Sequence, residues 1–159
     1  MLKQIVQIKS YRLDAAEREV AKAKRALLEQ QQLLEEHKKL VADFRLFMVE
    51  EKRRLFQKIE NLAIGLAKVN EYKDDVAELK ETLILKEQKT TELEDLLLQA
   101  EKRVTQARLQ YQKRYAELQK YQELMEEIGE NEQYLELRKE EVEQEDLVAS
   151  LLLRSSVRA

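Results

Sequence analysis

Three observations predict that this chain is all-α and folds as a long antiparallel two-helix coiled-coil hairpin. The first is composition: of 159 residues, 38% are charged, none is Pro and only two are Gly. The second is a heptad repeat of apolar residues, and the third is an interruption of that repeat near the middle of the chain. Residues that form turns are nearly absent, whereas good helix formers dominate. Few turns imply few, long helices.

The heptad repeat is the strongest of these signals. With Leu13 at position a, 16 of the 17 a positions through Met125 are apolar, and so are 10 of the 17 d positions. The total of 26 in 34 compares with about 15 expected from the 43% hydrophobic content of the chain. A repeat of 3.5 residues requires a facing helix, and we call the a and d residues together the seam.

The interruption predicts the turn. The d positions hold no apolar residue at Glu51, Lys58 and Gly65, and apolar residues return afterwards. Gly65 lowers helix propensity by about 1 kcal/mol relative to Ala. We therefore expect one coiled-coil domain over residues 1–159. Its parts are a helix over about 2–62, a turn over about 63–70, a second helix over about 71–153 and a frayed C-terminal tail.

The start of the second helix has two candidate caps. Asp75 and Glu78 have the spacing of a capping box, which would open the helix at Val76. Thr91 and Glu94 have the same spacing and offer a rival start.

The alternative architecture is one uninterrupted helix that pairs with a second chain, because the register continues across Gly65. Charge favours the hairpin. Residues 3–25 carry seven basic and three acidic side chains, whereas residues 123–146 carry eleven acidic and two basic ones. We expect an antiparallel hairpin to bring these two segments together.

Composition also excludes several kinds of site. The chain has no Cys, and a single histidine, His37, cannot build a metal site by itself. Gly65 and Gly129 stand alone, so they cannot form a phosphate-binding loop. A two-helix rod offers no cavity that would shift the pKa of a carboxylate for acid-base chemistry. We expect no catalytic residue, no cofactor and no metal, and therefore a protein that is not an enzyme.

Charge and hydropathy bear on partners and location. A net charge of −3 argues against nucleic-acid binding, which favours a basic surface. No segment approaches the roughly 20 apolar residues of a membrane span, and the N-terminus has no signal-peptide core. We expect a cytoplasmic protein that does not insert into the membrane.

Apolar residues off the seam cluster between residues 46 and 56, where a two-stranded coil cannot bury all of them. Such a cluster is typical of a partner-binding surface, although a third helix or a bend of the hairpin could also cover it. The candidate partner-binding residues, including the seam residues of this stretch, are Val41, Phe44, Leu46, Phe47, Met48, Val49 and Phe56.

A basic run near the N-terminus is a candidate docking face for an acidic partner. The alternatives are a solvated face, or neutralisation by the acidic C-terminal half. Leucines between residues 147 and 153 offer a further candidate contact near the C-terminus. The residues of the candidate basic face are Lys9, Arg12, Arg18, Lys22 and Arg25.

The chain resembles the YscO/FliJ family of coiled-coil proteins from bacterial type III secretion and flagellar export, and most of all its YscO branch. The resemblance extends over nearly the whole chain in length, periodicity and hairpin layout. Its most specific part is Asp43-Phe44-Arg45-Leu46-Phe47, followed by Glu50-Glu51 and Arg53-Arg54-Leu55-Phe56.

The resemblance implies a stalk that resembles the gamma subunit of rotary ATP synthases. Its partners would be a hexameric export ATPase, an export gate protein and the secretion chaperones that it escorts, and it would promote protein export. Its location would be the bacterial cytoplasm, in peripheral association with the secretion apparatus at the inner membrane. The family's gate-contacting surface would match His37, Val41, Phe44 and Met48.

Two functional hypotheses follow. A stalk or escort protein would be a monomer in isolation, with the paired N- and C-terminal ends facing the ATPase. A self-associating structural coiled coil or a prefoldin-like holding chaperone would be a dimer or larger, and its apolar residues off the seam would bind clients or sister chains.

Overall fold

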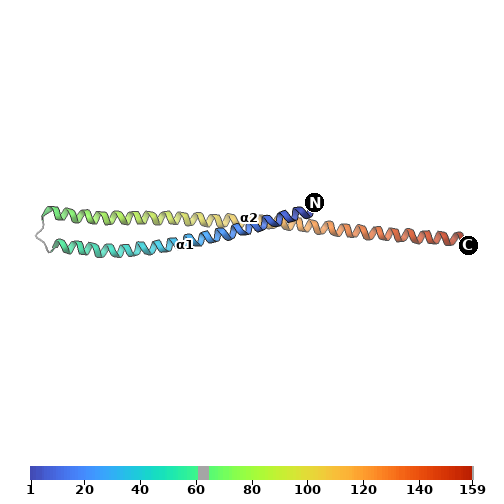
Figure 1. Cartoon of the computed structure of the whole chain (residues 1–159), viewed down its shortest axis with the longest axis horizontal. Coiled ribbons are helices and arrows are strands. Elements are labelled where there is room, and N and C mark those ends of the chain that lie inside the picture. Colours follow the sequence, from blue (N-terminus) through green and yellow to red (C-terminus); the bar gives the residue numbers. More distant parts are fainter. Residues whose placement is uncertain (61–64, 159) are drawn as a thin grey trace. The chain divides into compact units, whose positions relative to one another are not determined.

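The computed structural model describes residues 1–60 and 65–158, with side chains described through Ser156. It consists of two helices, α1 at Leu2–Glu60 and α2 at Leu66–Arg158, and no strand occurs within the described ranges (Figure 1). The predicted class, an all-α antiparallel two-helix hairpin, is confirmed.

The second helix extends further than predicted at both ends. Residues 61–64, where we placed the end of the first helix and the start of the turn, lie outside the described residues. The backbone N–H of Lys68 donates to the carbonyl of Gly65 at 3.1 Å, so the first turn of α2 begins there. Residues 66–70 are therefore helical rather than part of a turn, and α2 continues to Arg158 where a frayed tail was expected.

Packing explains why α2 begins early. Val69, Tyr72 and Val76 continue the seam at heptad spacing and are half-buried, so tertiary packing outweighs the weak helix propensity nearby. Both predicted capping boxes were wrong as helix starts, since they lie inside α2. The Thr91 hydroxyl instead donates to the carbonyl of Glu87, one turn earlier, at 3.3 Å.

Tertiary contacts divide the chain into two compact units. The first comprises Met1–Glu17 and Gln110–Ala159, and the second comprises Arg18–Leu109. Each unit contains a stretch of both helices. The prediction of a single coiled-coil domain over residues 1–159 stays a prediction.

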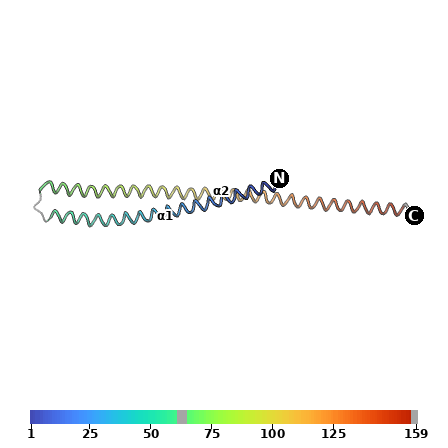
Figure 2. Tube along the Cα trace, in the orientation of Figure 1, coloured from blue at the N-terminus to red at the C-terminus, as the bar shows by residue number. Residues whose placement is uncertain are grey.

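The helices run antiparallel in the second unit. His37 contacts Lys86, and Phe56 packs against Tyr72, so the residue number on α2 falls as the number on α1 rises. Figure 2 shows the green-to-yellow course of α2 returning beside α1 in this unit. The antiparallel direction is thus fixed by contacts between residues that lie far apart in the sequence.

The predicted register is confirmed by burial. Every buried residue in the described part of the chain occupies an a or a d position. Small side chains at d, such as Ala16 and Ala100, let the helices approach closely. The seam is a single layer thick, and no large side chain among the described residues is fully enclosed. The buried residues are Ala16, Leu34, His37, Val41, Met48, Ala100, Val104 and Leu118.

The C-terminal part of α2 differs from the rest of the helix. All residues from Glu130 to Ser156 are exposed, although the helix is continuous. A membrane-spanning role is not indicated for any described helix, because none has a sufficiently long apolar stretch.

Candidate partner-binding surface

The structure divides the predicted partner-binding residues into an exposed and a covered group. Val41 and Met48, at a positions, are only 6% exposed and lie in the seam, and Phe44 is half-buried. The four residues off the seam are each between 51% and 69% exposed. We call this exposed group the α1 patch, and its members are Leu46, Phe47, Val49 and Phe56.

Aromatic contacts connect the α1 patch to the seam. The rings of Phe44 and Phe47 are tilted with their centroids 5.9 Å apart. The ammonium of Lys86 on α2 lies 5.1 Å from the centroid of Phe44, where a cation–π attraction operates. Phe44 is therefore covered from α2, whereas Phe47 presents its ring to solvent.

A groove of about 440 Å³ lies beside Phe47. Phe47 and Arg54 line it from α1, and Asp75 and Thr82 line it from α2. All four occupy g positions, which face one another in an antiparallel pair. The groove is open to solvent, and its lining is mixed: charged side chains surround a few apolar ones such as Phe47 and Leu79, a composition that suits a partner with both charged and apolar groups.

The cause of this groove is the polar stretch of d positions that also predicted the turn. Glu51 and Lys58 occupy d positions where apolar side chains would close the seam, and both line the groove. Charged groups resist burial because desolvation is costly, so they leave the space between the helices unfilled. A second groove of about 300 Å³ follows near Ile59 and Tyr72. The Phe56 ring meets Tyr72 edge-on at 6.3 Å.

Glu51 is held by an ion pair at the edge of the first groove. The Arg54 guanidinium donates to both carboxylate oxygens, through Nε at 3.2 Å and through Nη2 at 2.5 Å. The hydrogen bond from Arg54 lowers the pKa of Glu51, and the same pairing raises the pKa of Arg54. Both groups therefore stay charged at neutral pH.

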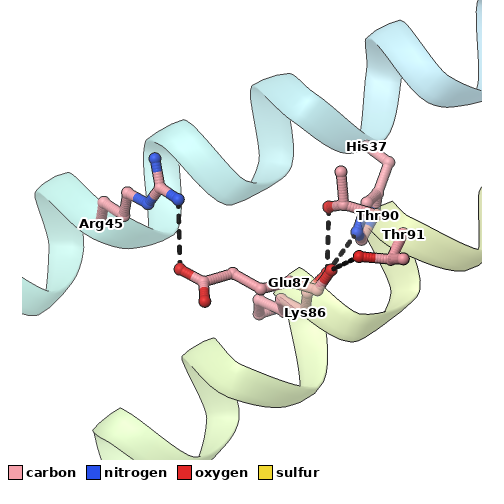
Figure 3. Close-up of polar contacts among 6 residues, drawn as sticks. All are labelled: His37, Arg45, Lys86, Glu87, Thr90 and Thr91. Atoms are coloured by element: carbon pink, nitrogen blue, oxygen red, sulfur yellow. Dashed lines mark hydrogen bonds and ion pairs between the residues drawn. The ribbon is translucent and has the colours of Figure 1, made fainter. Parts of the chain in front are cut away.

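His37 has a structural contact across the helix pair (Figure 3). Its Nε2 lies 2.9 Å from the carbonyl oxygen of Lys86, and since a carbonyl can only accept, Nε2 carries the proton. The Thr90 hydroxyl donates to the same oxygen at 3.1 Å. Two turns along α1, Arg45 Nη2 pairs with Glu87 Oε1 at 3.1 Å. His37 is only 9% exposed, so this side chain is part of the seam.

Lys9 is the one residue of the candidate basic face that occupies a d position. Its ammonium lies 3.1 Å from Glu117 Oε2 and 5.4 Å from the centroid of the Tyr121 ring. Arg114 Nη1 also approaches this carboxylate, at 3.4 Å. The hydrogen bond from Lys9 lowers the pKa of Glu117; partial desolvation opposes the shift, while the charges of Lys9 and Arg114 add to it.

The rest of the candidate basic face is exposed, and it divides between the units: Arg12 belongs to the first, and Arg18, Lys22 and Arg25 belong to the second. The expected meeting of this run with residues 123–146 is wrong for Lys9, whose partners precede Glu123. The reason is helix length. Since α1 has no residues before Leu2, it is too short on its N-terminal side to lie against most of the acidic segment. The residues of that segment from Glu130 onward are exposed.

Sequence patterns did not indicate the α2 walls of the first groove. Asp75, Glu78 and Thr82 lie there. Once the hairpin register is known, their g and c positions place them opposite Phe47, but that register depends on the start of α2. Within residues 1–60 and 65–158, no group of three His, Cys, Asp or Glu residues is arranged to hold a metal ion.

Two solved structures have a similar fold. Type III secretion protein YscO from Vibrio parahaemolyticus has a TM-score of 0.86 and 22% identity, with 92% of each chain covered. A YscO homologue from Chlamydia trachomatis has a TM-score of 0.84 and 23% identity, with 99% of this chain and 97% of that chain covered. These likenesses show that a long helical hairpin is shared.

Family membership follows from sequence comparison. Comparison with curated proteins gives no match. The family model described as Type III secretion protein YscO, however, matches residues 2–150, which is nearly the whole chain. The chain belongs to the YscO family of type III secretion proteins.

Proposed function

We propose that this chain is a non-enzymatic stalk and chaperone-escort protein that links a hexameric export ATPase to the export gate and promotes protein export. The observation that carries the proposal is the match to the YscO family over residues 2–150. The protein would act in the cytoplasm, in peripheral association with the secretion apparatus at the inner membrane.

The mode of action is binding. A two-helix hairpin exposes most of its side chains, and the groove beside Phe47 is open to solvent. Such a surface suits partner proteins better than small substrates, which bind in enclosed pockets. An asymmetric hairpin inside a six-fold ring would bind differently to subunits in different nucleotide states. Differential binding of this kind shifts the populations of those states. ATP hydrolysis would then change which ATPase subunits contact the hairpin.

Different surfaces would serve different partners. The end of the hairpin at which α1 begins would face the ATPase, and the exposed basic residues of α1 would meet an acidic partner. The α1 patch would bind the gate protein or a secretion chaperone. His37, Val41 and Met48 lie in the seam, so their use at the gate would require the hairpin to open.

The proposal is tested by mixing the purified chain with the export ATPase of its own secretion system. We expect a complex by size-exclusion chromatography with light scattering, and a changed rate of ATP hydrolysis. A hexamer that neither binds the chain nor changes its rate would overturn the stalk proposal.

A double variant tests the α1 patch separately. Leu46→Asp with Phe47→Asp should weaken binding to a gate protein or chaperone while ATPase binding persists. The matched control is Leu28→Asp with Leu33→Asp, two exposed residues elsewhere on α1, and it should bind all partners normally. Circular dichroism should show unchanged helicity for both variants. Equal binding by both would remove the α1 patch from the proposal.

A further inference from the structure

We infer that the exposed C-terminal part of α2 binds a basic amphipathic helix of another protein, as a continuation of the coiled coil. This inference goes beyond the proposed function and does not depend on ATPase binding. It rests on the apolar pattern, the charge and the surface shape of one stretch, residues 128–152, which we call the α2 extension.

The d positions of α2 stay apolar beyond the stretch that faces the N-terminus of α1, whereas the a positions Glu132, Lys139 and Asp146 are charged. Lys9 lies against Glu117 and Tyr121, and α1 begins only seven residues before Lys9, at Leu2. In an antiparallel pair, the N-terminus of α1 therefore lies opposite residues near Ile128. The d positions nevertheless stay apolar through the next three heptads, at Leu135, Val142 and Ala149. Leu135 is 64% and Val142 50% exposed, so these d positions have no facing helix within the described chain.

Charge indicates what kind of helix would cover this seam. Residues 123–146 carry eleven acidic and two basic side chains. Glu136 and Glu143 occupy e positions, and Glu145 occupies a g position, next to the seam. Residues at e and g form the interhelical salt bridges of a coiled coil, so a partner with Lys or Arg at these positions fits.

The acidic side chains also repel one another along the helix. Glu132 and Glu136, Glu136 and Glu140, and Glu141 and Glu145 are each four residues apart. Like charges at this spacing destabilise a helix. A basic partner would relieve this repulsion when it covers the seam, so binding and helix stability would reinforce each other.

The surface has a hollow of suitable chemistry. A shallow depression of about 460 Å³ is lined by Val148, Ala149 and Leu152, with Glu141, Gln144 and Glu145 at its edge. An apolar floor with an acidic rim suits a Leu side chain flanked by Lys or Arg. In a coiled coil, such a knob enters a hole formed by four residues of the facing helix.

A second copy of this chain does not fit as well. Two α2 extensions would place acidic residues against acidic residues, and like charges across an interface are costly. The basic residues of a second copy are spread over both helices, and in the paired stretches the seam residues of those helices are already covered by the facing helix. The observations therefore favour a different protein that presents a free basic helix.

The test uses the full-length chain and a synthetic four-heptad peptide with Leu at a and d and Lys at e and g. A control peptide has the same Leu residues with Glu at e and g. We expect the basic peptide to bind, measured by calorimetry, with affinity that falls as salt rises, because the contacts are ionic. The acidic peptide should not bind.

Matched variants locate the binding face. Leu135→Ser with Val142→Ser should weaken binding at least about tenfold, because two seam residues would no longer be buried. Leu137→Ser with Leu151→Ser alters two f positions of similar exposure on the opposite face, and should change affinity by no more than about twofold.

Three outcomes would overturn the inference: no binding of the basic peptide, equal binding of both peptides, or equal effects of the two variants. A fourth would replace it with self-association. In that case the chain alone would be a dimer by light scattering, and Leu135→Ser with Val142→Ser would make it a monomer.

Discussion

The ion pair between Lys9 and Glu117 should make the first unit sensitive to acid. Because its folded pKa is lowered below the ordinary value of 4.5, Glu117 takes up a proton more readily in the unfolded chain. The stabilisation is therefore complete above about pH 4.5 and is lost as pH falls through the folded pKa. Thermal unfolding by circular dichroism should show that Glu117→Gln lowers the melting temperature at pH 7, by an amount that shrinks as the pH falls toward 3.

A neighbouring carboxylate provides the control for this prediction. Glu126 is exposed on α2, and no ion pair of the described residues includes it. Glu126→Gln should not reproduce the pH-dependent difference. If Glu117→Gln and Glu126→Gln change the melting temperature alike at both pH values, the pair contributes nothing specific.

Gln30 is a polar residue at a d position, and its buried side-chain oxygen lacks the hydrogen bond that would offset the cost of burial. Its Oε1 is buried and has no hydrogen-bond partner within the described residues. An unsatisfied buried polar atom costs about 1–3 kcal/mol, so Gln30→Leu should stabilise the hairpin by about 1–2 kcal/mol. Urea unfolding measures this gain. Gln32→Leu, at an exposed f position, should stay within about 0.5 kcal/mol of the original chain.

At the scale of the elements, the part of α2 that follows Gly129, which includes most of the α2 extension, should contribute helix but little stability to the hairpin. Every residue from Glu130 to Ser156 is exposed, so removing this stretch uncovers no core. A chain that ends at Gly129 should keep its urea midpoint while its ellipticity falls in proportion to the lost helix. A clearly lower midpoint would mean that the extension packs against the hairpin.

The helices themselves could be predicted from the sequence because the seam repeats at fixed spacing. Val41, Met48 and Val104 were placed at a positions by counting alone, and all three are buried. The start of α2 could not be predicted in this way. Asn70 and the Asp74-Asp75 pair have weak helix propensity, and only the packing of Val69 and Tyr72 outweighs it.

The candidate site could be predicted in part, because the heptad spacing also shows which residues lie off the seam. Leu46, Phe47, Val49 and Phe56 lie off the seam by register, and the structure exposes them. The α2 walls of the groove could not be assigned, because cross-helix neighbours depend on the residue at which the chain turns. Lys9 shows the same limit: its pairing with Glu117 depends on how far α1 reaches.

For the molecule as a whole, the hairpin predicts a monomer. One chain supplies both helices of the seam, so light scattering should give a mass near 18.9 kDa. The continuous-helix alternative requires two chains and twice that mass. A doubled mass that persists on dilution would favour a self-associating coiled coil over a stalk.

The single-layer seam also determines how the protein should come apart. A seam one layer thick resembles a repeat protein, in which each layer contacts mainly its neighbours, so within each unit stability should accumulate layer by layer. Such a molecule can unzip from an end without melting elsewhere. Amide hydrogen exchange should therefore be graded along each helix. A partner that binds one end would then block opening from that end, and it would slow amide exchange in layers that it does not contact.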